Sequence, residues 1–272
     1  MNIISFGGGT NSSAMIIGLY QRNIPIDLIL FADTGGEKPH TYEFIKTLNS
    51  WLADKGLPEV TVVKAVHTLE YYCLKYEEFP SVVYGAGHCA VRHKIAPQEK
   101  FCNNDQQCKA VWSIGEKVNK YVGYDAGEQR RIDKNKEKHD ADKKYKHHFP
   151  LIEWGWTREE CIAAIEGAGL PLPGKSSCFF CPNNRKEEIV KLWKNHPDLF
   201  DRCVAMEHNA RTTKRDGTPS SIIGLGRTWT WEQYRKEYEH NEQWKADHFV
   251  LPGFEESTGG CCCGNPCGCS ED

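Results

Sequence analysis

The chain has 272 residues, and its 34 lysines and arginines nearly balance its 37 aspartates and glutamates. This length is enough to bury a hydrophobic core, and the balance of charge gives no overall signal for nucleic acid or for a membrane surface. No apolar run is long enough for a membrane helix, the first residues are typical of a strand rather than a signal peptide, and the 13 cysteines favour reduced thiols or metal ligands over disulfides. We therefore expect a cytoplasmic protein without a membrane partner.

The first predicted strand, residues 2–6, runs directly into a stretch of three glycines and four polar residues: Gly7, Gly8, Gly9, Thr10, Asn11, Ser12 and Ser13. The apolar residues after them are typical of a helix. Glycines let backbone N–H groups approach an anion closely, and the free N–H groups of a first helical turn point at it. The pattern favours a phosphate cradle over a plain turn in which Asn11 or Ser12 only caps the helix.

A second strand is predicted over residues 26–31, and it ends in Asp33, Thr34 and Gly35 before a predicted helix at 40–52. Open α/β sheets bind ligands at the carboxyl ends of their strands, so this turn is a candidate site beside the first loop. The alternative is that Asp33 and Thr34 only cap the next helix. A third strand, 59–65, and a helix, 68–76, follow, and the tyrosines of that helix are interpreted as packing residues.

The segment 88–97 is basic, and its Arg92 and Lys94 supply the positive charge that a nucleotide phosphate or a sulfate needs. The alternative is the basic start of a surface helix. A strand ending at residue 122 then leads into Gly123 and an arginine-rich turn, in which Arg130 or Arg131 can hold an anion through two hydrogen bonds. Residues 132–148 contain many lysines and histidines and few apolar residues, so we expect a mobile surface loop there; a nucleic-acid contact is weakened by its acidic residues.

A capping box at Thr157 and Glu160 predicts a helix start, and Cys161 on that helix is interpreted as a core residue. Cys178 and Cys181 form a C-x-x-C-P element, which is half of a metal site, so the other half must come from elsewhere in the chain. Residues 186–209 are predicted to be helical. The tail holds five more cysteines, as metal ligands, mobile thiols or inert residues: Cys261, Cys262, Cys263, Cys267 and Cys269.

Together these segments resemble the PP-loop ATP pyrophosphatases and the phosphoadenosine phosphosulfate (PAPS) reductase family. The family loop reads S-x-S-G-G-K-D-S, and the chain matches it at Ser5, Gly8, Gly9 and Ser12, with Gly, Thr and Asn where the family often has Ser, Lys and Asp. The stretches FADTGGEKPHTY, HCAVRHKIAP, GYDAGEQRR and CFFCP resemble later segments of the family in the same order. The loop lacks the family's lysine, so neutralisation of phosphate must come from elsewhere or from a metal ion such as magnesium.

The resemblance implies an α/β fold with a layered parallel sheet flanked by helices, like that of the adenine nucleotide alpha hydrolases. Residues 1–150 would form the nucleotide-binding core, 151–254 a helical part with the C-x-x-C element, and 255–272 a flexible Cys-rich tail. The implied nucleotide-binding residues are Ser5, Phe6, Gly7, Gly8, Gly9, Thr10, Asn11, Ser12, Ser13, Asp33, Thr34, Gly35, Gly123 and Glu128. The implied anion-binding residues are Arg92, Lys94, Arg130, Arg131 and Arg227.

The resemblance further implies an enzyme that binds ATP or an adenylyl sulfate and carries out sulfur chemistry with a sulfur or electron donor. Two reactions compete, namely reduction of a sulfonucleotide and ATP-dependent adenylation and thiolation of an acceptor, for which nucleic acid is a candidate. The E-C-G-I/L-H motif of assimilatory reductases is missing from the sequence. A non-enzymatic alternative is a zinc-binding interaction protein.

The implied cofactor is a 4Fe-4S iron–sulfur cluster held by Cys89, Cys178 and Cys181. The family's fourth cysteine is replaced by alanine here, so the fourth iron is left open or takes another ligand. The candidates for that ligand are His88, Cys102 and Cys161. Zinc is the rival, because three cysteines and one histidine make a common closed site.

Overall fold

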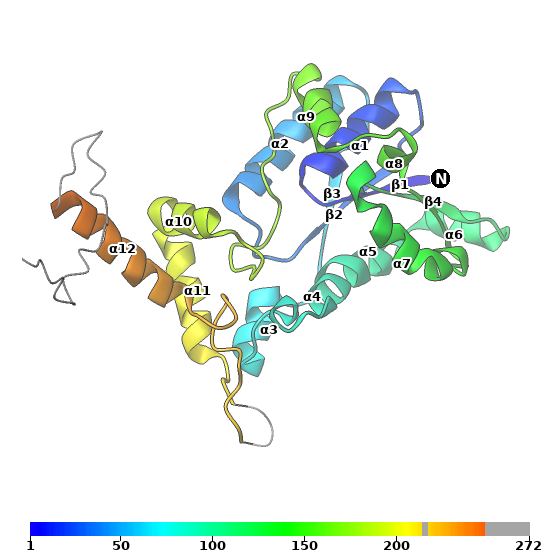
Figure 1. The fold of residues 1–272 in the computed structure, drawn as a ribbon. Coiled ribbons are helices and arrows are strands. Elements are labelled where there is room, and N and C mark those ends of the chain that lie inside the picture. The colour runs from blue at the N-terminus through cyan, green and yellow to red at the C-terminus, as the bar shows by residue number, and fades with distance from the viewer. Residues whose placement is uncertain (214–216, 248–272) are drawn as a thin grey trace, which may run out of the picture. The chain divides into compact units, whose positions relative to one another are not determined.

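Five short segments pair into an all-parallel sheet in the computed structural model, which describes residues 1–213 and 217–247, with side chains described as far as residue 243. The strands are β1 (Asn2–Phe6), β2 (Leu28–Asp33), β3 (Val60–Lys64), β4 (Val118–Val122) and β5 (Tyr145–His148). Their order across the sheet is β3-β2-β1-β4-β5 (Figure 1). The strands β1 and β2, which lie inside the sheet, are rich in buried apolar residues, as expected for strands covered on both faces.

The order of the strands reverses between β1 and β4. The chain moves outward from β1 to β2 and β3, and then returns to the other side of β1 to add β4 and β5. Ser5 pairs with Val122 on one side of β1, and Phe6 pairs with Phe31 on the other. The loops that follow β1, β2 and β4 therefore meet at one edge of the sheet, and such a reversal opens a crevice beside the carboxyl ends of the strands.

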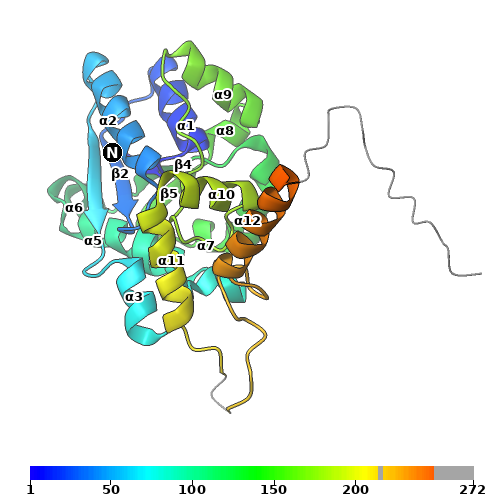
Figure 2. The same cartoon turned by 90° about the vertical axis from the view of Figure 1, so that its left-hand side faces the viewer.

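Helices cover both faces of this sheet. One face carries α1 (Thr10–Gln21), α2 (Pro39–Asp54) and α9 (Arg158–Gly167), and the other carries α5 (Ala96–Asn104) and α6 (Gln106–Ser113), as Figure 2 shows. Side chains alternate along a strand, so neighbouring residues of β1 enter different cores. The first core cluster includes Ile4, Phe6, Met15, Phe44, Cys161 and Ile165. The second includes Ile3, Leu30, Val63, Cys102, Cys108 and Val118.

Further elements connect and extend these layers. They are α3 (Leu69–Tyr76), the 3-10 turn η1 (Ser81–Tyr84), α4 (His88–Ala90), the π-helical segment η2 (Val91–Ile95), the 3-10 turn η3 (Ala126–Glu128), α7 (Gln129–Asp140), α8 (Pro150–Glu153), α10 (Lys186–Asn195), α11 (Pro197–Asn209) and α12 (Trp231–Asp247). Residues Met1–Trp231 form one compact unit, which contains the predicted core and most of the predicted helical part. The predicted Cys-rich tail lies outside the described residues.

The predicted strands and helices before residue 123 are confirmed, with shifts of one or two residues at their ends. The layered parallel α/β architecture is confirmed as well. The predicted helix over 186–209 is interrupted at His196, because the residue before a proline disfavours helical backbone. None of the helices in the described ranges is long and apolar enough to cross a membrane.

The prediction of a mobile loop over residues 132–148 is wrong. The segment contains most of α7 and all of β5, which pairs with β4 at the edge of the sheet. The 3-10 turn η3 leads into α7 and begins at a capping box, in which the side chains of Asp125 and Glu128 accept backbone N–H groups of η3. Few apolar residues are needed for an edge strand and a surface helix, and a composition-based interpretation misses both.

Candidate functional site

The loop after β1 has one position at which only glycine fits and a second at which a Cβ atom would crowd a neighbouring side chain. Gly8 has a φ of +74°, and a Cβ atom there would lie 2.8 Å from Cγ2 of Thr41 and 3.1 Å from a ring carbon of Phe31. A Cβ atom on Gly9 would lie 2.9 Å from the hydroxyl of Ser176. The loop is therefore enclosed by β2, by α2 and by the segment that precedes the C-x-x-C element, and its backbone is what it can present to a ligand.

The hydroxyl groups of the loop brace its backbone. Oγ of Ser12 accepts the N–H of Gly7 at 3.2 Å and donates to the carbonyl of Gly9 at 3.1 Å, and Oγ of Ser13 donates to the same carbonyl at 2.8 Å. Gly9 is the N-cap of α1 and has no side chain with which to accept the N–H groups of the first turn. Because α1 begins directly after the carboxyl end of β1, the free N–H groups of its first turn are available at this edge of the sheet, as expected of an anion site.

The turn after β4 is fastened to the start of α1. A Cβ atom on Gly123 would lie 2.9 Å from Cα of Ser12, so the two backbones touch. The amide of Asn11 donates to Asp125 at 2.8 Å and to Glu128 at 3.3 Å, and its carbonyl oxygen accepts from Arg158 at 3.0 Å. The side chains of Asn11 and Glu128, both predicted to bind nucleotide, thus hold the loop in place.

The turn after β2 is organised by the buried carboxylate of Asp33. It accepts the N–H of Gly35 at 2.7 Å and the hydroxyl of Tyr42 at 2.8 Å, and it pairs with Lys64 at 3.1 Å. Burial, together with this hydrogen bond to Asp33, raises the pKa of Tyr42. Asp33 therefore shapes the turn, and the hydroxyl of Thr34 donates to Glu37 at 3.2 Å.

A buried ion pair, which the sequence analysis did not identify, joins this turn to η2. Oε1 of Glu37 lies 3.0 Å from Nζ of Lys94, and the Glu37 side chain is fully buried. Burial lowers the pKa of Lys94, but the Glu37 carboxylate outweighs that effect and raises it. Oε2 of Glu37 has no hydrogen-bond partner among the described residues. An acidic residue two positions after a glycine turn was the available signal for this pair.

The C-x-x-C element docks against the same turn. Cys178 and Glu37 form an antiparallel bridge, and the N–H of Phe179 donates to the carbonyl of Gly36 at 2.7 Å. The thiol of Cys178 lies 3.2 Å from the hydroxyl of Thr34. The N–H of Cys181 closes the turn on the carbonyl of Cys178 at 3.0 Å. The C-x-x-C element, which is far from the first loop in the sequence, thus lies at the same edge of the sheet.

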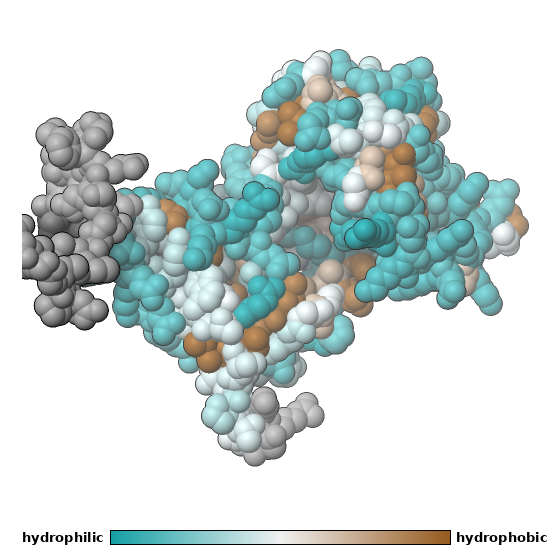
Figure 3. Space-filling view, viewed as in Figure 1, coloured by the Kyte–Doolittle hydropathy of each residue, from teal (hydrophilic) through white to brown (hydrophobic). Residues whose placement is uncertain are grey.

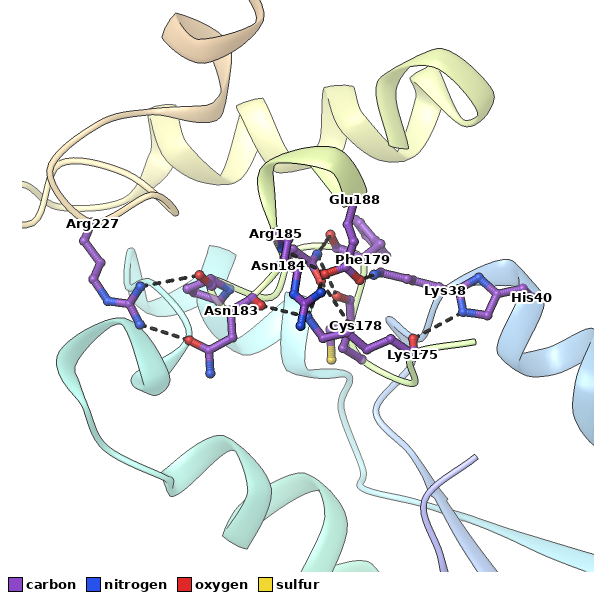
Figure 4. Close-up of polar contacts among 12 residues, drawn as sticks. Lys38, His40, Lys175, Cys178, Phe179, Asn183, Asn184, Arg185, Glu188 and Arg227 are labelled. Atoms are coloured by element: carbon purple, nitrogen blue, oxygen red, sulfur yellow. Dashed lines mark hydrogen bonds and ion pairs between the residues drawn. The ribbon is translucent and has the colours of Figure 1, made fainter. Parts of the chain in front are cut away.

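Charged side chains hold the C-x-x-C element in place (Figure 4). Glu188 pairs with Lys38 at 2.6 Å and with Lys175 at 2.7 Å. Burial raises the pKa of Glu188, but hydrogen bonds from a backbone N–H and from these two lysines lower it to about 2. On the other side, Arg227, with a φ of +71°, donates to Oδ1 of Asn183 at 3.0 Å. Arg227 therefore contacts the residues that follow the C-x-x-C element. Its role in binding an anion stays a prediction.

The three predicted metal ligands lie in one region but do not form a ready metal centre. Burial and the Glu37 carboxylate raise the pKa of Cys178, and burial raises that of Cys181, which also feels the charge of Cys89. Within residues 1–213 and 217–243, no group of three or more His, Cys, Asp or Glu side chains is placed to hold a metal ion. Ligation of a cluster by these cysteines stays a prediction.

Two candidates for a fourth ligand are wrong. Cys161 is buried in the first core cluster and Cys102 in the second, on opposite faces of the sheet. Neither cluster contains Cys89, Cys178 or Cys181. His88 lies beside Cys89 and lines the same cavity.

Several other predicted side chains are engaged within the protein. The hydroxyl of Ser5 donates to Gln98 at 3.0 Å, and Phe6 is buried against Phe31. Arg131 pairs with Glu128 at 2.5 Å, and Arg130 is exposed on α7. Only backbone atoms of Ser5 and Phe6 can therefore serve a ligand at the strand end.

The surface is hollowed in the middle of the view in Figure 3, beside the place where β2 ends in Figure 1. The glycine loop, the turn after β2 and the C-x-x-C element all belong to this edge of the sheet. No protein-family model matches the chain, and no curated protein shows significant similarity to it. The function is therefore inferred from the site.

Proposed function

We propose that the chain binds an adenine nucleotide at the carboxyl edge of its sheet and uses it in sulfur chemistry, as an enzyme resembling the PAPS reductase family with an adenine nucleotide alpha hydrolase-like fold. The observation that carries the proposal is the position of the glycine loop. It follows the strand at which the sheet order reverses, and Gly8 and Gly123 let backbone approach where no side chain fits. Phosphate groups bind at such points through backbone N–H groups.

The charges at this edge indicate how phosphate would be neutralised. Lys38 and Lys175 are paired with Glu188, and Lys94 is paired with Glu37. Because these lysines already have carboxylate partners, backbone N–H groups and a divalent cation such as magnesium are the expected counterparts of the phosphates. This accords with the absence of a lysine from the glycine loop.

Sulfur chemistry is supported by the thiols at the same edge. Cys178 contacts Thr34 in the turn after β2, and Cys181 interacts electrostatically with Cys89. Reduction of a sulfonucleotide and adenylation followed by thiolation of an acceptor both need a nucleotide and a nearby sulfur centre. The two reactions differ in the nucleotide bound, since the first uses an adenylyl sulfate and the second uses ATP.

The nucleotide site is tested by Gly8→Val, which places a branched side chain against Thr41 and Phe31. We expect titration calorimetry with ATP and with adenosine phosphosulfate to show an affinity loss of about 100-fold or more, or roughly 2.8 kcal/mol. Gly167→Val is the control, because a Cβ atom at Gly167 meets nothing within 4 Å. Ser12→Ala, which removes only the hydroxyl brace, is the milder companion, with an expected loss of about tenfold. Undiminished binding in folded Gly8→Val and Ser12→Ala proteins would contradict the proposal.

The cofactor is tested on anaerobically purified protein. We expect iron and sulfide to co-purify with the chain and visible absorption to disappear in Cys178→Ala and Cys89→Ala, because these thiols are predicted ligands. Cys108→Ala is the control, since Cys108 is buried in the second core cluster. A colourless protein with stoichiometric zinc lost in the same variants would replace the iron–sulfur prediction by the zinc one.

A further inference from the structure

A second cavity, of about 380 Å³, lies between α3, η1 and the α4–η2 segment. Four aromatic side chains line it: Tyr72, Tyr76, Phe79 and Tyr84. Tyr72 and Tyr76 are stacked with ring centroids 5.6 Å apart, and Tyr76 and Tyr84 are 51% and 53% exposed. The sequence analysis interpreted the tyrosines of α3 as packing residues, but the rest of the protein would cover the rings of packing residues. Exposed aromatic rings around a cavity of this size are suited to stacking on a flat ligand.

Arg92 supplies this cavity with a positive charge that is available to a ligand. The guanidinium of Arg92 lies 4.8 Å from the centre of the Tyr72 ring, and both residues line the cavity. Arg92 forms no ion pair with the carboxylates in the described part of the chain, whereas Lys94, two residues later, is paired with Glu37. A guanidinium beside an aromatic face can bind an anionic group while the ring stacks on an aromatic one.

A buried histidine completes the lining. His93 is 1% exposed, and neither of its ring nitrogens has a hydrogen-bond partner in the described part of the protein. The rings of His93 and Tyr72 meet edge to face, with centroids 5.3 Å apart, so His93 supports the Tyr72 ring from within the cavity wall. Burial, and then Arg92, lower the pKa of His93.

The backbone around these residues is unusual. Arg92 and His93 lie in η2, a π-helical segment, and π-helical turns are frequent at functional sites. The same segment presents Lys94 to the turn after β2, and α3 begins where the N–H of Leu69 donates to the carbonyl of Thr34 at 3.0 Å. The cavity therefore shares its walls with the edge that carries the proposed nucleotide site, and Cys89 lines it.

We propose that this cavity binds a second nucleotide, either free or as part of a single strand. Its base would stack on the tyrosines, and its phosphate would meet Arg92. Binding at the cavity does not require the first site to be occupied.

The test measures binding to the full chain by titration calorimetry. The probes are adenosine monophosphate, uridine monophosphate and a short oligothymidylate, each added to Gly8→Val protein and to wild-type protein saturated with ATP. We expect binding of at least one probe under both conditions. Arg92→Ala and Tyr72→Leu should each weaken it by about tenfold or more, since the first removes the cation and the second removes the stacking ring. Lys109→Ala, on exposed α6 surface, should leave it unchanged.

A shape-preserving variant separates ligand binding from structure. His93→Phe removes the two unpaired nitrogens but keeps a ring against Tyr72, so we expect a higher melting temperature with nucleotide binding retained. A preference of tenfold or more for the oligothymidylate identifies a strand as the source, and equal affinity identifies free nucleotide. Absence of binding by every probe, or binding unaffected by Arg92→Ala and Tyr72→Leu, would overturn this proposal alone. Normal ATP binding by Gly8→Val protein would instead overturn the proposed first site.

Discussion

At the scale of single residues, the candidate site is defined by where a Cβ atom does not fit. A Cβ atom added at Gly8, Gly9 or Gly123 would lie within 3 Å of a neighbouring atom. A Cβ atom added at Gly87 or Gly167 would meet no atom within 4 Å. At Gly123 the neighbour is backbone, which cannot rotate away. The glycines of the loop therefore do more than permit a turn, because they bring β1, β4 and α1 into direct contact at the point where a ligand would bind.

Gly123→Ala tests this contact. The added methyl group must displace the first turn of α1, so we expect a loss of about 1–3 kcal/mol in the free energy of unfolding and weaker nucleotide binding. Denaturant titration measures the first effect and calorimetry the second. Gly167→Ala is the matched control and should be neutral or slightly stabilising, because the added methyl has room and alanine favours helix. Equal stability of the two variants would contradict this expectation, because it would show that the first turn of α1 moves aside without a cost in the free energy of unfolding.

The sequence identifies the glycine loop but not the partners of its polar neighbours. Ser5 and Asn11 match or flank the nucleotide-binding pattern, yet their side chains bind Gln98 and Asp125. These partners lie about a hundred residues away along the chain, and no local pattern encodes such contacts. Backbone geometry is predictable from glycines and hydroxyls, whereas the use of each side chain depends on the tertiary fold.

At the scale of elements, α7 shows how a helix with hardly any apolar residues is retained. The ring of His139 stacks on His147 at 4.5 Å between centroids and lies 5.3 Å from Phe149, and the guanidinium of Arg131 lies over Tyr124. Aromatic contacts thus hold α7 against β5 and the residues that follow it. Hydrophobic periodicity cannot reveal such a helix, which explains why sequence analysis expected a loop there.

These contacts make stability dependent on pH. Burial lowers the pKa of His139 and of His148, so the unfolded chain binds more protons than the folded one as pH falls through about 6.5. The folded state therefore loses stability between pH 7 and pH 5, and the melting temperature should fall across this range. His139→Phe should reduce that dependence. An unchanged pH profile in His139→Phe would contradict this account.

At the scale of the whole molecule, the unit Met1–Trp231 ends in a residue that belongs to its interior. Trp231 is 1% exposed, and its backbone N–H donates to Glu207 at 2.9 Å. The same carboxylate accepts the N–H of Leu225 at 2.8 Å. The last segment of the unit is therefore tied to α11 through one buried carboxylate.

This arrangement predicts where the chain can be shortened. Truncation after Phe254, which removes the Cys-rich tail, should leave the melting temperature nearly unchanged, because the core lies within residues 1–231. Trp231→Ala should instead lower the free energy of unfolding by about 3–5 kcal/mol. Thermal melts of the two proteins provide the comparison. A large loss of stability on truncation would indicate that the tail contributes a structural metal site.

The central position of β1 also governs the order of events during synthesis on the ribosome. Ile3 pairs with Leu28 on one side and with Lys120 on the other. A nascent chain that has not yet extended to Val122 therefore carries β1 with one edge unpaired, a surface that chaperones and other nascent chains can occupy. Gly123 is missing at that stage as well, so the close contact between the turn after β4 and the first turn of α1 forms only after β4 has emerged.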